Sequence, residues 1–333
     1  MTMRAVVVDR LAADYAGVFV RQVERPRPGS GQVLIRVRAA SVNFPDLLQT
    51  EGKYQHKPDL PFVAGMEAAG EVVEAGEGSG FAVGDRVVGS ARPEGVSGTG
   101  GPGAFAEYCV MTAPRRMPEH FSYSQAAAFG TAYLTAWVSL VSRADLQPGE
   151  WVLVHGASGG VGLAAVDLAK ALGGRVIATG ASDEKLAIVN EMYAPDAILN
   201  VSGGFRDQVK AITGGGGADV IYDPVGGDVF DESVRCIAFN GRLLTIGFAS
   251  GRIPTLPVNM ALIKGFSLMG VRAGEYGRRF PDRGRANLDA IWAMAEAGKL
   301  TPRVHAEFSL DDWRAAYDQL GNRQVVGKAI IRP

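Results

Sequence analysis

Cysteine, histidine and net charge are all scarce in this sequence. Its 333 residues include two cysteines and four histidines, and the formal net charge at pH 7 is −1. Cys109 and Cys236 are too few for a disulfide framework or a four-thiolate zinc site. A net charge near zero produces no global field that would attract nucleic acid or a membrane surface, so we expect neither as a partner.

Long apolar runs are missing as well. No run approaches the roughly 18 apolar residues of a membrane span. The apolar run within Met1–Asp9 is too short for a signal peptide. The content of 47% hydrophobic and 21% charged residues is typical of a globular protein, and the length allows two domains of ordinary size. These features predict a soluble, cytoplasmic protein.

A glycine-rich turn between a strand pattern and a helix pattern is the most informative feature present. The strand pattern Trp151–His155 runs into Gly156–Gly162, and a helix pattern follows to about Leu172. Glycines allow a tight turn and a close approach of the backbone to phosphates, and the helix N-terminus supplies free N–H groups. The strand before and the helix after are the context that this motif requires. We therefore predict a dinucleotide pyrophosphate here, with an ordinary strand–turn–helix as the alternative.

The first part of the chain is rich in strand patterns. Turn residues such as Pro26–Gly29 and Glu77–Gly80 separate the candidates. The candidate strands are residues 5–8, 18–23, 32–39, 70–75, 86–88 and 104–110. Their spacing and alternation favour an antiparallel, barrel-like domain over a sandwich. The segment Gly89–Gly103 has no periodicity and is predicted to be a loop.

From about Ser122 helices and strands alternate. The strand candidates are residues 151–155, 175–179, 197–199, 220–223, 242–246 and 267–271. Helical patterns lie at residues 124–129, 131–144, 161–172, 183–192, 205–213 and 228–238. Six short apolar strands linked by helices predict a doubly wound parallel sheet, because the crossover helices cover both faces. The last elements, helices 285–297 and 311–320 and strands 304–308 and 328–331, are expected to return to the first domain.

The end of the second predicted strand of this sheet bears on the choice of coenzyme. Sites that prefer NAD usually place a carboxylate about 20 residues after the glycine loop, where it accepts a hydrogen bond from the ribose 2′-OH. Here Gly180 follows the strand directly, Ser182 can donate a hydrogen bond and Lys185 can supply charge to a 2′-phosphate. Asp183 and Glu184 are expected in the first turn of the next helix. The segment favours NADPH, and a solvated helix position is the alternative for Lys185.

Short segments along nearly the whole chain carry a family resemblance. They are Ala40–Asp46, Gly52–Tyr54, Leu60–Glu67, Gly84–Val87, Phe105–Tyr108, Gly156–Gly162, Asp223–Gly227, Gly241–Arg242 and Gly327–Lys328. With the order of the domains, they resemble the medium-chain dehydrogenase/reductase superfamily, in its zinc-independent, zeta-crystallin-like quinone oxidoreductase branch. The resemblance implies an α/β fold in which residues 125–271 form a Rossmann domain with a doubly wound parallel sheet. Residues 1–124 and 272–333 would form a GroES-like, barrel-like, β-rich catalytic domain. A homodimer, joined through the sheet edge, is implied as well.

The resemblance also implies that no metal is bound. In the zinc alcohol dehydrogenases of this superfamily, a cysteine ligand falls at Asn43, a histidine ligand at Met66 and a third, a thiolate, near Phe129–Thr131. None of these ligand types is present at these places, and no two of the four histidines have ligand spacing. Without a Lewis acid, hydride transfer suits an acceptor that is already electrophilic, such as a quinone or a conjugated enone.

Three catalytic residues are implied by the resemblance: Asn43, Asp46 and Tyr54. Tyr54 and Asn43 can donate hydrogen bonds to the oxyanion that develops on the acceptor, and Asp46 can orient the others. The alternative for Asn43–Asp46 is a plain helix start, with Asn43 as the cap and Pro45 in the first turn.

Contacts to NADPH are implied in the same way. Ser158, Gly159, Gly160 and Val161 are expected at the pyrophosphate, and Thr131 near the nicotinamide ribose. The remaining implied contacts are Asn200 at the adenosine pocket, Arg323 toward the 2′-phosphate, and the backbone of Gly247, Phe248, Ala249, Met269, Gly270 and Val271 at the nicotinamide. Val201 stands where related enzymes often carry an aromatic residue or histidine.

The prediction is a zinc-independent, NADPH-dependent oxidoreductase that reduces a small-molecule quinone or conjugated enone. An enoyl-CoA or enoyl-thioester reductase is the alternative. For it, the basic run Arg278, Arg279, Arg283 and Arg285 would bind an anionic acceptor; otherwise this run is a solvated helix start. A cofactor-binding structural or RNA-associated protein is the alternative of another class, and the lack of interleaved aromatic and basic residues argues against RNA.

Overall fold

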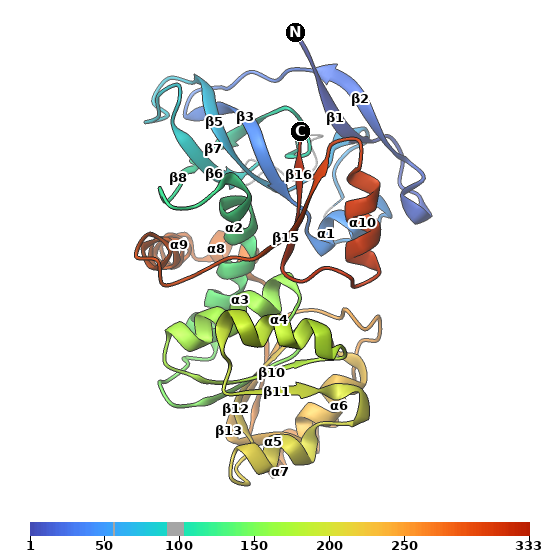
Figure 1. Ribbon diagram of the computed structural model, residues 1–333, viewed down its shortest axis with the longest axis vertical. Coiled ribbons are helices and arrows are strands. Elements are labelled where there is room, and N and C mark those ends of the chain that lie inside the picture. Colours follow the sequence, from blue (N-terminus) through green and yellow to red (C-terminus); the bar gives the residue numbers. More distant parts are fainter. Residues whose placement is uncertain (56, 92–102) are drawn as a thin grey trace. The chain divides into compact units, whose positions relative to one another are not determined.

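The computed structural model describes residues 1–55, 57–91 and 103–333 (Figure 1). These residues form two compact units, Met1–Thr131 with Pro302–Pro333 and Ala132–Thr301. Most of the loop predicted at Gly89–Gly103 lies outside the described residues. Each unit has its own apolar core.

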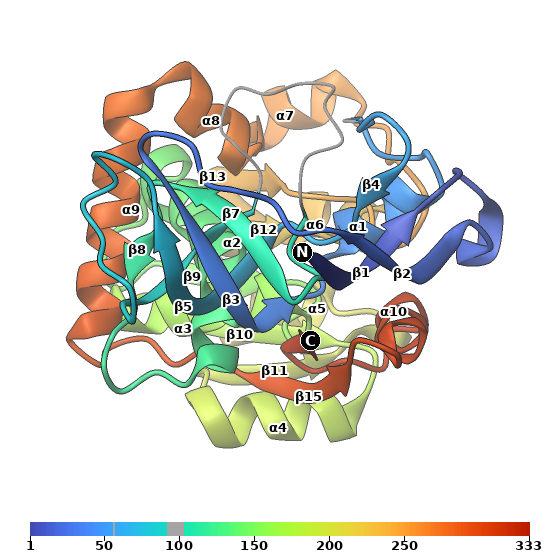
Figure 2. The same ribbon diagram turned by 90° about the horizontal axis from the view of Figure 1, so that it is seen from above.

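The first unit is built around a mostly antiparallel sheet with the strand order β15-β16-β3-β5-β6-β8. Figure 2 shows β3 beside β5 and β7, and β3 pairs with both. Only β15 and β16 run parallel to each other. The strands are β3 Gln32–Ser41, β5 Glu67–Ala75, β6 Arg86–Ser90, β7 Tyr108–Thr112, β8 Arg115–Arg116, β15 Val304–Ser309 and β16 Lys328–Arg332.

A smaller sheet closes the core of the first unit. It has the order β2-β1-β4, with β1 Thr2–Val8, β2 Val18–Glu24 and β4 Phe62–Val63. The Val6 N–H donates to the Phe105 carbonyl over 2.8 Å, which ties β1 to the segment before β7. Strands of both sheets contribute to one apolar core, and this arrangement confirms the predicted barrel-like domain.

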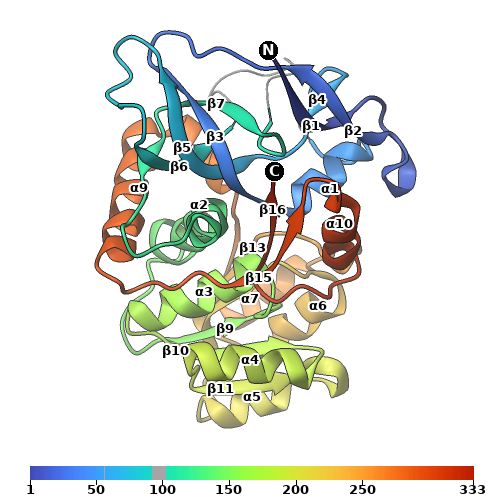
Figure 3. The ribbon, with the colours of Figure 1, turned by 45° about the horizontal axis from the view of Figure 1, so that its top comes forward.

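The C-terminal segment returns to this unit, as expected. Helix α10, Trp313–Gly321, packs Trp313 and Tyr317 into the core that also holds Phe105. Figure 3 shows α10 beside α1, Phe44–Thr50, and the two helices are in contact. A short 3₁₀ helix, Ala13–Tyr15, places Tyr15 edge-on against Tyr317 with ring centroids 5.2 Å apart.

The second unit has a parallel sheet with the strand order β11-β10-β9-β12-β13-β14. Its strands are β9 Trp151–Val154, β10 Arg175–Gly180, β11 Ala197–Asn200, β12 Ala218–Asp223, β13 Ile237–Thr245 and β14 Ser267–Gly270. The order runs outward from β9 in both directions, which confirms the predicted doubly wound sheet.

Helices cover both faces of this sheet. Figure 1 shows α3 and α4 on one face and α5 and α6 on the other. The helices are α3 Gly160–Ala171, α4 Asp183–Tyr193, α5 Arg206–Ile212, α6 Gly227–Cys236, α7 Val258–Lys264, α8 Ala273–Arg279 and α9 Pro281–Glu296. Within the described residues, no helix is both long and apolar enough to cross a membrane.

Two expectations along the chain need correction. The helices predicted at 124–129 and 131–144 are one α-helix, α2 Tyr123–Trp137, which continues as a π-helical turn, Val138–Arg143. The second unit also extends beyond the predicted boundary at residue 271 and ends at Thr301. Both helices after that boundary contact this unit: Trp137 donates to Asn287 of α9 over 3.1 Å, and α8 contacts the π-helical turn Val138–Arg143. A periodic pattern shows that a helix is amphipathic, and it does not show which domain the helix packs against.

A buried histidine links three elements of the second unit. His155 follows β9 and is 1% exposed. Its ring nitrogens lie 2.8 Å from the Thr179 hydroxyl on β10 and 2.8 Å from the Ser233 hydroxyl on α6. Burial lowers the pKa of His155 to about 3, so the ring is neutral in the folded protein near pH 7.

We expect His155 to lower the stability of the folded state in acid. An unfolded histidine titrates near 6.5 and His155 near 3, so the unfolded chain binds one more proton between these pH values. Asp167 opposes this effect, because burial raises its pKa to about 6 and the folded chain holds that proton more tightly. Urea denaturation of the wild type and of His155→Gln at pH 7 and pH 5 separates the effect of His155 from that of Asp167, since both proteins contain Asp167. The wild type should lose about 2 kcal/mol more unfolding free energy than the variant. Equal losses of unfolding free energy in the two proteins would contradict a lowered pKa of His155 in the folded state.

Candidate active site

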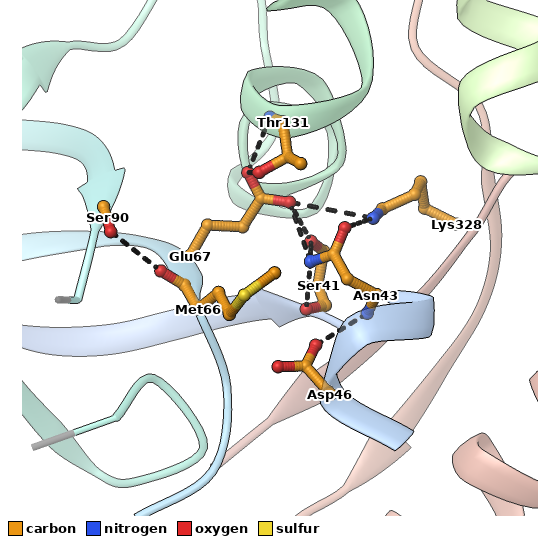
Figure 4. Close-up of polar contacts among 8 residues, drawn as sticks. All are labelled: Ser41, Asn43, Asp46, Met66, Glu67, Ser90, Thr131 and Lys328. Atoms are coloured by element: carbon orange, nitrogen blue, oxygen red, sulfur yellow. Dashed lines mark hydrogen bonds and ion pairs between the residues drawn. The ribbon is translucent and has the colours of Figure 1, made fainter. Parts of the chain in front are cut away.

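A buried polar network lies at one end of the large sheet in the first unit (Figure 4). The neighbouring strands β16, β3 and β5 supply most of it. The pairing of β16 with β3, with Ile330 opposite Ser41, brings Lys328 toward Asn43 just beyond β3, and the pairing of β3 with β5, with Ala40 opposite Ala68, brings Ser41 toward Glu67. Because cross-strand partners project from the same face of a sheet, strand pairing itself brings these polar side chains together.

Glu67 is the centre of this network and is 5% exposed. Its Oε1 accepts hydrogen bonds from the Ser41 hydroxyl at 2.6 Å and the Asn43 amide at 3.1 Å. Its Oε2 accepts from the backbone N–H and the hydroxyl of Thr131, each at 2.8 Å. A Cβ atom at position 130 would lie 2.9 Å from Oε2, so Gly130 allows the carboxylate to reach helix α2. All these partners donate, as an ionised carboxylate requires.

Lys328 supplies the positive charge of the network. Its Nζ lies 2.6 Å from Asn43 Oδ1 and 3.6 Å from Glu67 Oε1, and the side chain is buried. Burial lowers the pKa of Lys328, while the negative charges of Glu67 and Asp46 raise it. Asn43 therefore bridges the two charged groups, with its oxygen toward the ammonium and its nitrogen toward the carboxylate.

The predicted catalytic residues separate into a pair and a single residue. Asn43 is the N-cap of α1, and Asp46 accepts a hydrogen bond from the Asn43 backbone N–H over 2.8 Å. The backbone is thus a helix start, whereas the Asn43 side chain turns to Glu67 and Lys328. Tyr54 lies half-buried after α1, and its hydroxyl makes no hydrogen bond with the described part of the chain.

Glu67 and Lys328 were not among the predicted site residues. Both lie in segments that carried the family resemblance, at the start of β5 and of β16. The available signal for these two site residues was a charged residue, a glutamate or a lysine, directly before an apolar strand pattern. Among the described residues, no three histidine, cysteine, aspartate or glutamate side chains are placed so that they could hold a metal ion.

The glycine-rich turn has the backbone geometry that a pyrophosphate site needs. Gly156 has a φ of +56°, and a Cβ atom at position 162 would lie 2.2 Å from the Gly156 carbonyl oxygen. Helix α3 begins after Gly159 with no side-chain cap, so its first N–H groups are left for a ligand. The residues predicted at the pyrophosphate, Ser158 to Val161, lie together at this turn and fit that group.

The residues predicted near the ribose lie after β10 and β11. Ser182 caps α4, its hydroxyl accepting from the Lys185 backbone N–H over 3.4 Å. Asp183 and Glu184 lie in the first helical turn, as predicted. The Asn200 amide donates to the Asp183 carboxylate over 2.8 Å, which places a negative charge beside the predicted 2′-phosphate residues. Lys185 is half-buried, and burial lowers its pKa.

The predicted nicotinamide contacts lie just after β13 and at the end of β14. The Ala249 N–H donates to the Pro224 carbonyl over 3.1 Å, and the Val271 N–H donates to the Thr245 carbonyl over 2.9 Å. Gly247–Ala249 follows β13, and Met269–Val271 covers the end of the adjacent strand β14, so both segments lie at the carboxyl edge of the sheet, where such sheets bind ligands.

Two other predicted contacts, and the basic run, have different surroundings. Thr131 and Arg323 belong to the first unit, where Thr131 donates to Glu67 and Arg323 is exposed. In the basic run, Arg278 and Arg279 both pair with Glu275 at 2.8 Å, and Arg285 pairs with Asp282. These pairs, three and four residues apart, favour the solvated-helix interpretation.

Comparison with known proteins identifies both units. Residues 29–119 match the family model of the alcohol dehydrogenase GroES-like domain, and residues 160–290 match that of the zinc-binding dehydrogenase. A quinone oxidoreductase-like protein 2 homolog of Nematostella vectensis is 41% identical over 307 residues, which cover 91% of this chain and 82% of that protein.

Solved structures resemble the whole chain. A mycobacterial protein complexed with NADPH has a TM-score of 0.84 at 31% identity and covers 99% of this chain and 100% of its own. An NAD-dependent alcohol dehydrogenase has a TM-score of 0.87 at 31% identity, with the same coverage of both chains. One neighbour is thus complexed with NADPH, and the other is named for its dependence on NAD.

Replacing Gly162 with alanine should destabilise the glycine-rich turn. The new Cβ would meet the Gly156 carbonyl at 2.2 Å, and such overpacking typically costs about 1–3 kcal/mol. Gly159→Ala is the matched control, because Gly159 has a φ of −76° and its nearest contact would be 3.3 Å away. Urea denaturation of the coenzyme-free proteins should show the larger loss for Gly162→Ala; equal losses would refute the close-approach argument.

Proposed function

The chain belongs to the medium-chain dehydrogenase/reductase family, in its quinone oxidoreductase branch, and from this premise we propose that it is a zinc-independent, NADPH-dependent reductase of quinones or conjugated enones. The observation that carries the proposal is the ammonium of Lys328, 2.6 Å from Asn43 Oδ1. Asn43 occupies the position of a cysteine ligand of zinc relatives. A fixed cation at this point disfavours a second, divalent one, and it already forms an ion pair with Glu67.

An acceptor that needs no Lewis acid follows from this electrostatic argument. Quinones and conjugated enones delocalise the incoming negative charge onto oxygen without a metal. The coenzyme would supply the hydride when bound. The chain then has to hold the coenzyme and acceptor together, exclude water and donate a hydrogen bond to the developing oxyanion.

The residues divide these tasks in the proposed mechanism. The turn Gly156–Gly162 holds the pyrophosphate on the N-terminus of α3, and Ser182 and Lys185 take the 2′-phosphate. Thr131 orients the nicotinamide ribose. Tyr54 donates to the oxyanion, since its hydroxyl has no other partner within the described chain. Asn43 and Asp46 position the start of α1, because the Asn43 amide already points to Glu67 and Ser41.

The remaining proposed contacts follow the same division. Asn200 borders the adenosine, Arg323 approaches the 2′-phosphate, and the backbone of Gly247–Ala249 and Met269–Val271 meets the nicotinamide. Arg278, Arg279 and Arg285 of the basic run pair with carboxylates of their own helices, which favours a solvated helix over a site for an anionic acyl-CoA. A cytoplasmic location stays a prediction.

Coenzyme oxidation assays test the proposal directly. We expect faster turnover with NADPH than with NADH when benzoquinone or a simple enone is the acceptor. Tyr54→Phe should lower kcat on the order of 100-fold, because one oxyanion donor is lost, while the KM for NADPH is unchanged. Tyr123→Phe is the control, since the Tyr123 hydroxyl donates to Glu71 over 2.9 Å and neither residue belongs to the network around Glu67. Turnover of crotonyl-CoA alone, or a preference for NADH, would refute the assignment.

We also propose a homodimer joined along β14, the edge strand of the parallel sheet. Leu268 on β14 is 45% exposed, and other large apolar side chains nearby in sequence are exposed too: Phe239, Val258, Leu262 and Ile263. An exposed strand edge with apolar side chains is a surface that pairs with another chain. A second copy of this chain offers the same surface, as a two-fold interface requires.

Light scattering after gel filtration tests the dimer. The wild type should have twice the 35.1 kDa mass of one chain, and Leu268→Arg should have the mass of one chain. Ile198→Arg is the matched control, because Ile198 is 40% exposed on β11, the opposite edge strand. A wild type with the mass of one chain, or a Leu268→Arg variant that stays dimeric, would rule out this interface.

A further inference from the structure

Lys328 is held in place by the backbone of its strand. Lysine is almost never fully buried unless it is paired, and Lys328 is 7% exposed. Gly327, with a φ of +86°, turns the chain into β16, and the Lys328 N–H donates to the Arg303 carbonyl over 3.1 Å. The next residue, Ala329, accepts from the Val42 N–H over 2.9 Å. The ammonium therefore projects from a fixed point of the sheet.

The charges around Lys328 make its ammonium necessary. Two buried carboxylates, Glu67 and Asp46, both act on it. Arg332 lies at the other end of β16 and pairs with Glu307 instead. Removing the ammonium would leave buried negative charge without compensation, which is costly in a low-dielectric interior.

Lys328 also determines the direction of the Asn43 amide. The amide oxygen faces Nζ, so the amide nitrogen must face Glu67 and Ser41. Glu67 in turn holds both the N–H and the hydroxyl of Thr131 through its second oxygen. A single ammonium on β16 thus orders groups on α1 and on α2.

We propose that Lys328 is a positioning residue: its ammonium orients Asn43 directly and Thr131 through Glu67, and so determines how the nicotinamide end of the coenzyme is held. The inference rests on the proposed function, which places Thr131 at the nicotinamide ribose. Lys328 acts through these two residues and need not touch the substrate. A merely structural ion pair would stabilise the fold without affecting the bound coenzyme.

The test compares Lys328→Met, Glu67→Gln and the double variant with the wild type. Arg332→Met is the matched control, since it removes an exposed cation from the same strand. Three quantities are measured: the Kd for NADPH, the fluorescence emission of bound NADPH, and kcat with benzoquinone. The emission reports the surroundings of the nicotinamide without requiring turnover.

We expect Lys328→Met to lower kcat about tenfold or more, because small misplacements of reacting groups have large effects on rate. The emission of bound NADPH should change, while its Kd stays within about threefold, because the pyrophosphate turn is untouched. Adding Glu67→Gln should recover part of the lost kcat, since the uncompensated carboxylate is then gone. Arg332→Met should match the wild type in all three quantities.

Unchanged emission and kcat in a folded Lys328→Met variant would overturn the proposal, as would losses that simply add in the double variant. If Lys328→Met does not fold, the double variant is compared with Glu67→Gln alone, and equal kcat and emission would overturn it. If the wild type binds NADPH but reduces no acceptor, the proposed function fails, and the emission of the variants still decides the role of Lys328.

Discussion

The first unit depends on how a buried carboxylate is satisfied. An ionised glutamate in an apolar interior costs several kcal/mol unless donors and a cation surround it. Glu67 obtains these from β3, β16 and α2, and each of those elements is constrained as a result. Gly130 has to leave room for the carboxylate, and the strand register has to place Lys328 and Ser41 within reach.

The second unit depends on backbone geometry instead of charge. Its parallel strands are covered by helices on both faces, so most strand residues are apolar and buried. The glycine-rich turn needs glycine at two points, because Gly156 has a positive φ and Gly162 packs against its carbonyl. His155, just before this turn, is the polar exception, and hydroxyls on β10 and α6 satisfy it.

Local patterns predicted the elements better than their contacts. The strands of the parallel sheet were predicted largely within the bounds observed, because short apolar runs between turn residues are a local signal. Strand β5 of the large sheet was predicted to begin at Gly70 and begins at Glu67. A polar residue at a strand end weakens the strand pattern, so the residue at the centre of the site was left outside it. The helices α7 and α8, of seven residues each, were not predicted.

The sequence by itself determined the fold class and the glycine-rich turn. These depend on residue types at fixed spacings along the chain, which the sequence displays directly, whereas the places of zinc ligands at Asn43 and Met66 were implied by the family resemblance. Only the tertiary structure decided that the Asn43 amide faces Lys328, 285 positions away, and that the helices after residue 271 belong to the second unit. The physical reason is that a buried charge is satisfied by whatever groups the sheet brings next to it, and strand pairing brings together residues that are remote in sequence.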